Sequence, residues 1–259
     1  MSAQTPPATE HIYEPSKVTE GTTLPRSEDL ETYHLCPEAG LIVWAVPGPL
    51  RDIAVLDITA PPPDAFARRQ PFAIFGPNDE PTTFHPIASL PAVYPLVSGL
   101  TVCVDHLEEF MSECEVMSEQ HEFEPGSEDG DTNEYCICEE CKEHPFLLYK
   151  QPPKLYVEAK EKPYVTLGDV VLAVNGWIPK IWQDILLAGK AMFDEWGTQW
   201  PPLPADTKFW IHGPFLPSDI MLERQEPTGS GSLRGREKYW QECISEVAKR
   251  QSELRDKAM

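Results

Sequence analysis

The chain has 259 residues, of which 41% are hydrophobic, enough for one domain with a buried core or for two small ones. Its net charge of −21 disfavours direct binding of nucleic acid, because phosphates are neutralised by clustered lysine and arginine. The 28 prolines against 15 glycines indicate long irregular connections, and no repeat of fixed period is present.

The sequence also predicts the compartment. Residues 1–17 lack the apolar run of a secretory signal, and no stretch approaches the roughly 18 apolar residues of a membrane span. The seven cysteines are then expected to be reduced thiols or metal ligands, not disulfide partners. We therefore expect a cytoplasmic or nuclear protein that is not secreted and does not act at a membrane.

Residues 1–32 are polar and rich in proline, and we expect them to form a disordered or surface-lying arm. A single α+β domain is expected over residues 33–222. Short apolar or β-branched runs between turn residues predict its strands, at residues 41–46, 53–58, 71–75, 100–104, 146–149, 154–157 and 207–211. The first two of these are expected to pair as a hairpin, and the third is expected at a sheet edge.

The following segment, residues 105–143, contains fifteen carboxylates and one lysine, a net charge of −14. A short helix is expected over residues 107–116, whereas residues 119–134 are too polar to fold alone. We expect a long acidic, largely disordered insertion between two strands that pair with each other. It is either a solvated loop or a surface for a basic partner or a divalent cation, although it lacks the EF-hand spacing for calcium.

A C-x-C-x-x-C run closes this insertion. Cys136, Cys138 and Cys141 are followed by His144, and four thiolate or imidazole ligands are what a tetrahedral structural zinc site requires. These four residues are the predicted ligands of one structural zinc, the sole cofactor that the sequence suggests. The alternative is that these four residues lie in a loop and bind no metal.

Two variations on the cysteine run stay open. Cys114 or His121, across the acidic loop, could replace the histidine or complete the ligand set. A redox pair at Cys138 and Cys141 is disfavoured, because nearby glutamates raise the pKa of a thiol and no thioredoxin-like βαβ unit surrounds the pair.

Residues 165–196 are predicted to form a pair of helices that organises the domain. Thr166 and Asp169 suit a capping box, Asn175-Gly176 a helix stop, and Pro179 the first turn of the second helix. The apolar residues have the spacing of one helical face: Leu167, Val170, Val171, Val174 and Trp177. We therefore expect an α+β fold in which a small, mainly antiparallel sheet packs on the helix pair.

The C-terminal part is expected to contain two further helices. Ser218 would cap a short helical turn through Leu222, residues 223–233 would form a flexible joint, and residues 234–259 would form an amphipathic helix. The apolar stripe of that helix consists of Trp240, Cys243, Ile244, Val247 and Leu254. The stripe could dock on the protein's own core or on a partner.

Enzyme motifs are mostly absent, since there is no P-loop, G-x-G-x-x-G, G-x-S-x-G or H-E-x-x-H. The first hypothesis is a non-enzymatic interaction or scaffold protein that binds a protein partner, with a basic surface, through the acidic insertion or the C-terminal helix. The second is an enzyme with a pocket between the sheet and the helix pair. It would use dispersed residues such as His85, His212, Asp169 or Asp206. The third is a zinc-binding regulatory protein.

The order of His85-Pro86, a strand, and then Val165-Thr166-Leu167-Gly168-Asp169-Val170 resembles a family of uncharacterised fungal domains. In these domains, proline-bounded strands precede a valine-threonine-x-x-aspartate-valine helix start, and a second helix follows. The resemblance covers residues 85–215, and the acidic insertion with its cysteines departs from the compact family pattern. It implies a fungal, intracellular, small α+β domain, and it transfers no activity and no catalytic residue.

Overall fold

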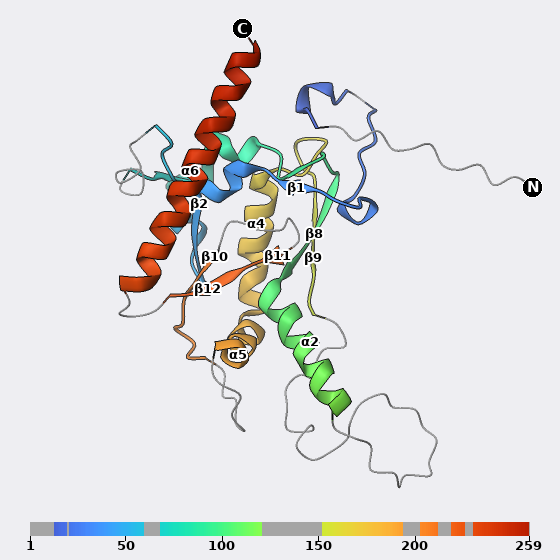
Figure 1. Cartoon of the computed structure of the whole chain (residues 1–259). Coiled ribbons are helices and arrows are strands. Elements are labelled where there is room, and N and C mark those ends of the chain that lie inside the picture. Colours follow the sequence, from blue (N-terminus) through green and yellow to red (C-terminus); the bar gives the residue numbers. More distant parts are fainter. Residues whose placement is uncertain are drawn as a thin grey trace, which may run out of the picture.

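A computed structural model describes residues 13–19, 21–59, 68–120, 152–193, 203–211, 219–225 and 230–258. Within these residues the fold is α+β, as predicted, and Figure 1 shows its course. The α-helices are α2 (Asp105–Gln120), α4 (Leu167–Trp177), α5 (Trp182–Phe193) and α6 (Ser230–Ala258). Single turns of 3₁₀ helix connect the elements: η1 (Pro15–Lys17), η2 (Ser27–Asp29), η3 (Pro37–Leu41), η4 (Leu50–Asp52), η5 (Pro86–Ser89) and η7 (Ile178–Lys180).

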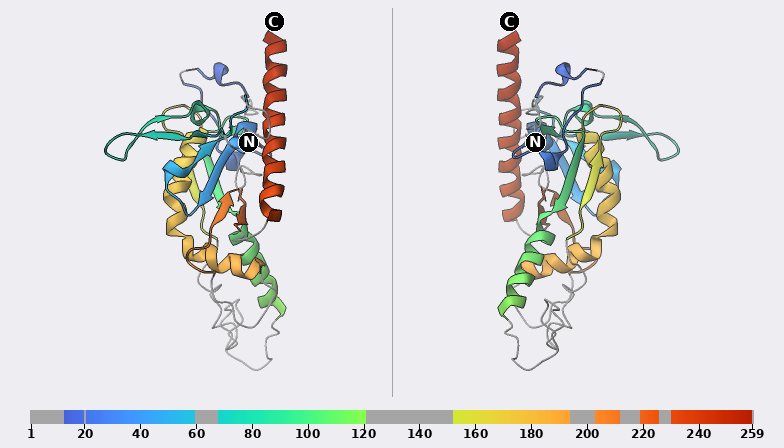
Figure 2. Two further views of the ribbon diagram at one scale, coloured as in Figure 1. Left: turned by 90° about the vertical axis from the view of Figure 1, so that its left-hand side faces the viewer. Right: turned by 90° about the vertical axis from the view of Figure 1, so that its right-hand side faces the viewer.

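A five-stranded antiparallel sheet forms one part of the centre. Its strands, in spatial order, are β12 (Leu222–Arg224), β10 (Phe209–Ile211), β2 (Ile42–Val46), β3 (Ala54–Val55) and β4 (Gln70–Pro71). Apolar side chains on both faces of β2 are buried, because helices lie on both sides of this layer. Figure 2 shows α4 on one side of the strands and α6 on the other.

A three-stranded sheet adjoins it, in the order β11 (Asp219–Ile220), β8 (Gly99–Val104) and β9 (Leu155–Glu158). β8 pairs antiparallel with β9, with Val102 opposite Leu155, whereas β11 is parallel to β8. The acidic insertion therefore lies between two strands that pair with each other, which confirms that prediction. Two small two-stranded sheets complete the fold, β1 (His34–Leu35) with β7 (Val93–Tyr94) and β5 (Ala73–Phe75) with β6 (Pro81–Phe84).

Most predicted strands are present, and four of them are shorter than expected. Those at 41–46, 53–58, 71–75, 100–104, 154–157 and 207–211 correspond to β2, β3, β5, β8, β9 and β10, and the strand at 146–149 lies outside the described residues. The first two form the expected antiparallel pair, with Val43 opposite Ala54. β5 lies in its own two-stranded sheet, and the segment at 85–99 contains η5 and β7.

Three predictions of segment ends were wrong. Strands β11 and β12 replace the expected helical turn and extend into the expected joint at 223–233, because Ile220 and Leu222 are buried while Met221 between them is 37% exposed, a period of two. Gly176 does not end α4, which continues to the buried Trp177 and passes through η7 into α5. Residues 230–233 belong to α6 and not to a flexible joint, since a helix anchored elsewhere extends over weak helix formers.

The N-terminal segment packs on the body at Val18 and again from residue 21 onward. Leu24 is only 6% exposed and Ser27 is buried. The Ser98 hydroxyl donates to the carbonyl oxygen of Leu24 at 3.0 Å, and the Thr101 N–H donates to the Ser27 hydroxyl at 3.1 Å. These bonds fasten residues 21–32 along β8, so this part lies on the surface in an ordered path.

The C-terminal helix docks on the protein's own core. Trp240 is 3% exposed and Val247 fully buried, and the Trp240 ring meets Trp210 of β10 edge to face at a centroid distance of 6.0 Å. A Cβ atom at Gly40 in η3 would lie 2.7 Å from the Cys243 sulfur, so α6 sits close against η3. No helix among the described residues is long and apolar enough to cross a membrane.

Candidate functional site

A groove of about 330 Å³ lies where the first turns of α4 approach η5. The end of β6 and η5 form one wall, through Phe84, His85, Pro86, Ala88 and Ser89. The opposite side comes from residues 160–162 and from α4, through Thr166, Gly168, Asp169 and Leu172. Two residues of the enzyme hypothesis, His85 and Asp169, therefore border the same groove although 84 positions separate them in the chain.

Asp169 forms the predicted capping box with Thr166, so its carboxylate is already hydrogen-bonded. Its Oδ2 accepts hydrogen bonds from the Thr166 N–H at 3.0 Å and from the Thr166 hydroxyl at 2.7 Å. In return the Asp169 N–H donates to Thr166 Oγ1 at 3.1 Å. Because Asp169 is only 7% exposed and already bonded, it stabilises the start of α4 and is poorly placed to take a proton from a substrate.

His85 is a cap as well. Its Nδ1 accepts a hydrogen bond from the Ile87 N–H at 3.2 Å at the start of η5, and Pro86 occupies the first position of that turn. Burial lowers the pKa of His85 below its ordinary value, so the neutral ring is favoured near pH 7. With Nδ1 accepting, the proton of the neutral ring is on Nε2. The remaining ring nitrogen, Nε2, is therefore a donor and not a general base.

Gly168 allows the first turn of α4 to lie close against η5. A Cβ atom at this position would lie 2.9 Å from the carbonyl oxygen of Ala88, and backbone cannot move away cheaply. The Leu167 N–H also donates to the carbonyl oxygen of Leu90 at 2.9 Å, which binds the first turn of α4 to the chain after η5. The base of the groove is therefore fixed by backbone contacts.

The rim of the groove is charged and exposed. Lys160, Glu161 and Lys162 are all exposed, and neither ammonium forms an ion pair with any residue that the structure describes. Phe84 adds an apolar surface, with 36% of its side chain exposed. Sequence reasoning missed these rim residues, and the one available signal was a Lys-Glu-Lys run shortly before a capping box.

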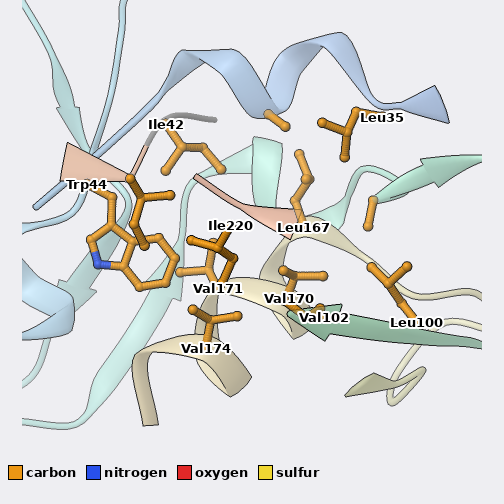
Figure 3. A pocket seen from close by; sticks show the side chains of 13 residues that line it. Leu35, Ile42, Trp44, Leu100, Val102, Leu167, Val170, Val171, Val174 and Ile220 are labelled. Atoms are coloured by element: carbon orange, nitrogen blue, oxygen red, sulfur yellow. The ribbon is translucent and has the colours of Figure 1, made fainter. Parts of the chain in front are cut away.

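A second cavity belongs to the core. It has a volume of about 40 Å³ and lies between α4 and the two central sheets. Figure 3 shows Val170, Val171 and Val174 of α4 facing side chains such as Ile42 and Ile220 across it. An apolar void of this size remains dry, because a buried water needs several polar partners. We therefore treat it as a packing defect of the core and not as a ligand site.

Two of the described cysteines, Cys36 and Cys243, are protonated structural residues. Cys36 and Cys103 are buried, and the Cys36 thiol donates to a carboxylate oxygen of Glu38 at 2.9 Å. Burial, reinforced by the Glu38 charge, raises the pKa of Cys36 well above its usual range, and burial also raises that of Cys243. Neither thiol is a suitable nucleophile at neutral pH.

The predicted zinc ligands Cys136, Cys138, Cys141 and His144 lie outside the described residues, and so do His121 and His212. Cys114 lies on α2, and Asp206 lies in an exposed turn that does not line the groove. Within the described ranges no group of three or more His, Cys, Asp or Glu residues could hold a metal ion.

Comparison with protein-family models, with curated proteins and with solved structures found no match to this chain. The resemblance of residues 85–215 to uncharacterised fungal domains stays a prediction.

Proposed function

We propose that this chain is a non-enzymatic interaction protein of the cytoplasm or nucleus. It binds a protein partner with a basic surface through the acidic insertion, residues 105–143. The observation that carries the proposal is the placement of this insertion. It leaves the sheet at the end of β8 and returns at β9, the strand paired with β8.

The base of the insertion packs against the body. Leu107 and Phe110 in the first turns of α2 are buried, and α2 packs against α5. An ion pair of 3.3 Å between Glu108 and Lys154 joins the outgoing and returning chain. Figure 1 shows α2 pointing away from the body beyond this base. Residues 105–143, which include this base, carry a net charge of −14, and such a local concentration of charge favours steered association with a basic surface.

Two alternatives receive less support. The stripe of α6 is covered by the protein's own core at Trp240, Ile244 and Val247, so this face is not available to a partner in this arrangement. The enzyme hypothesis needs free acid or base groups, but the groove atoms Asp169 Oδ2 and His85 Nδ1 already serve as helix caps.

A charge-neutralised variant tests the proposal. The seven carboxylates of residues 119–134 are changed to the corresponding amides, and a control variant keeps the same residues in shuffled order. Each full-length protein is used for affinity capture from the source organism, at two salt concentrations, with quantitative mass spectrometry. We expect a basic protein that wild type and the shuffled control retain, that high salt releases, and that the neutralised variant loses at least tenfold.

The proposal fails if the neutralised variant retains the same proteins as wild type. It also fails if the captured protein has no basic surface, or if wild type captures nothing above the neutralised variant. If the shuffled control also loses the captured protein, the partner recognises a specific sequence motif and not the charge of the insertion.

A further inference from the structure

The groove beside η5 has the size and layout of a small-molecule site. Its volume of about 330 Å³ is within the range of roughly 300–1,000 Å³ for ligand pockets. Apolar surface comes from Phe84, Pro86, Ala88 and Leu172, and polar side chains come from residues 160–162, His85, Ser89, Thr166 and Asp169. Such a combination of apolar surface with a few polar groups is typical of sites for amphiphilic organic ligands.

The charged residues at the edge of the groove determine which charge a ligand should carry. Lys160 and Lys162 line the groove, and their ammoniums pair with no carboxylate among the described residues. Two carboxylates oppose them, Glu161 on the exposed rim and Asp169 at the base. Asp169 is buried and already accepts two hydrogen bonds, so Glu161 is the main competitor for the lysines.

Phe84 supplies an apolar contact that the body leaves uncovered. Phe84 ends β6, a strand whose four residues are all exposed, and its ring packs edge to face on the buried Phe72 at a centroid distance of 6.0 Å. The ring is therefore held in place while part of its surface faces outward. A flat or extended apolar group could lie against it and remain within reach of both lysines.

We propose that this groove binds a small organic carboxylate with an apolar body, held by Lys160 and Lys162 at the rim and by Phe84 on one wall. This binding is separate from the protein contact of the acidic insertion. A ligand of this class fits the volume of the groove, whereas a larger occupant would extend beyond its lining.

Three matched probes test the proposal: 4-phenylbutyrate, 4-phenylbutan-1-ol and 4-phenylbutylamine share one apolar body and differ in charge. Binding to the full chain is followed by titration with NMR detection of groove amides and of the His85 ring. We expect the carboxylate to bind best and the amine worst, with about a tenfold difference between the carboxylate and the alcohol.

Four variants test which residues of the groove contact the probes. The double variant Lys160→Gln/Lys162→Gln is expected to lose the preference for the carboxylate, and Phe84→Ala is expected to weaken all three probes. Glu161→Gln is expected to strengthen carboxylate binding about two- to threefold, since it removes the competing charge. Lys180→Gln, an exposed change in η7 beyond the end of α4, is the control and should bind as wild type does.

All substituted residues except Phe84 are well exposed, so their variants should fold, and a thermal melt checks each one. Equal binding of alcohol and carboxylate would overturn the proposal. So would a preference that survives in the double-lysine variant, or perturbed amides that lie outside the groove.

Discussion

Two charged helices lie at the border of this molecule and are held in different ways. α6 carries an apolar stripe over Trp240, Ile244 and Val247, and the body buries all three. α2 buries Leu107 and Phe110 near its start and then continues into the acidic sequence. Net charge is therefore a poor guide to whether a helix belongs to the body, because the number of apolar side chains on one face decides how much area is buried.

The largest expected effect is the loss of α6. Deletion of residues 234–259 exposes the core surface that Trp240, Ile244 and Val247 cover, and we expect unfolding at ambient temperature or a loss of several kcal/mol. Replacement of residues 119–134 by a glycine-serine linker of equal length should leave the free energy of unfolding nearly unchanged. Chemical denaturation of both variants measures the contrast, and similar losses in the two would contradict it.

A single substitution should reproduce much of the effect of the deletion. Trp240→Ala removes a buried ring that contacts Trp210, and we expect about 3–5 kcal/mol of destabilisation. The matched control is Gln241→Ala, on the exposed face of the same helix, which should stay within about 0.5 kcal/mol of wild type. A Trp240→Ala protein as stable as the control would mean that α6 does not pack as described.

The close approach of α6 to η3 can be tested by a double-mutant cycle. Gly40→Ala would place a methyl group 2.7 Å from the Cys243 sulfur, and we expect about 1–3 kcal/mol of destabilisation by overpacking. Cys243→Ala removes that sulfur, so the double variant should recover part of the loss. Strictly additive effects in urea denaturation would show that the two positions are not in contact.

The base of α2 should respond to pH. Burial lowers the pKa of His106, against a smaller opposite effect of Asp105, so the folded state favours the neutral ring. The stabilisation from the neutral ring is complete above the unfolded pKa of about 6.5 and is lost as the pH falls below it. His106→Gln should therefore lose less stability than wild type between pH 7.5 and 5.5. Equal slopes in denaturation series at several pH values would exclude this coupling.

The smallest effect on the body is expected from the cysteine run. If Cys136, Cys138, Cys141 and His144 hold zinc, metal analysis of protein purified without chelator will find about one zinc per chain. Because these residues lie in the insertion, removal of the metal should change global stability by less than about 0.5 kcal/mol. Metal-free protein, or equal zinc content in a Cys138→Ser variant, would contradict the site.

The sequence predicts the elements that local chemistry determines. The capping box of Thr166 and Asp169 and the stripe of α6 follow from spacing within a few residues, and the structure contains both. The strand at β11 was missed because its two residues depend on pairing with β8, more than a hundred positions earlier. The groove was missed for the same reason, since Phe84 and Lys160 share it only through tertiary packing.

The pairing of Val102 with Leu155 has a consequence for how this protein can change. When the two ends of a loop are already held together, a longer loop costs little extra free energy of closure, roughly 0.6 kcal/mol for each doubling of its length. The acidic segment can therefore lengthen, shorten or alter its composition while the strands beneath it stay paired. Its sequence can vary to suit a partner with little restriction from the fold, and the same position would accept an inserted reporter domain.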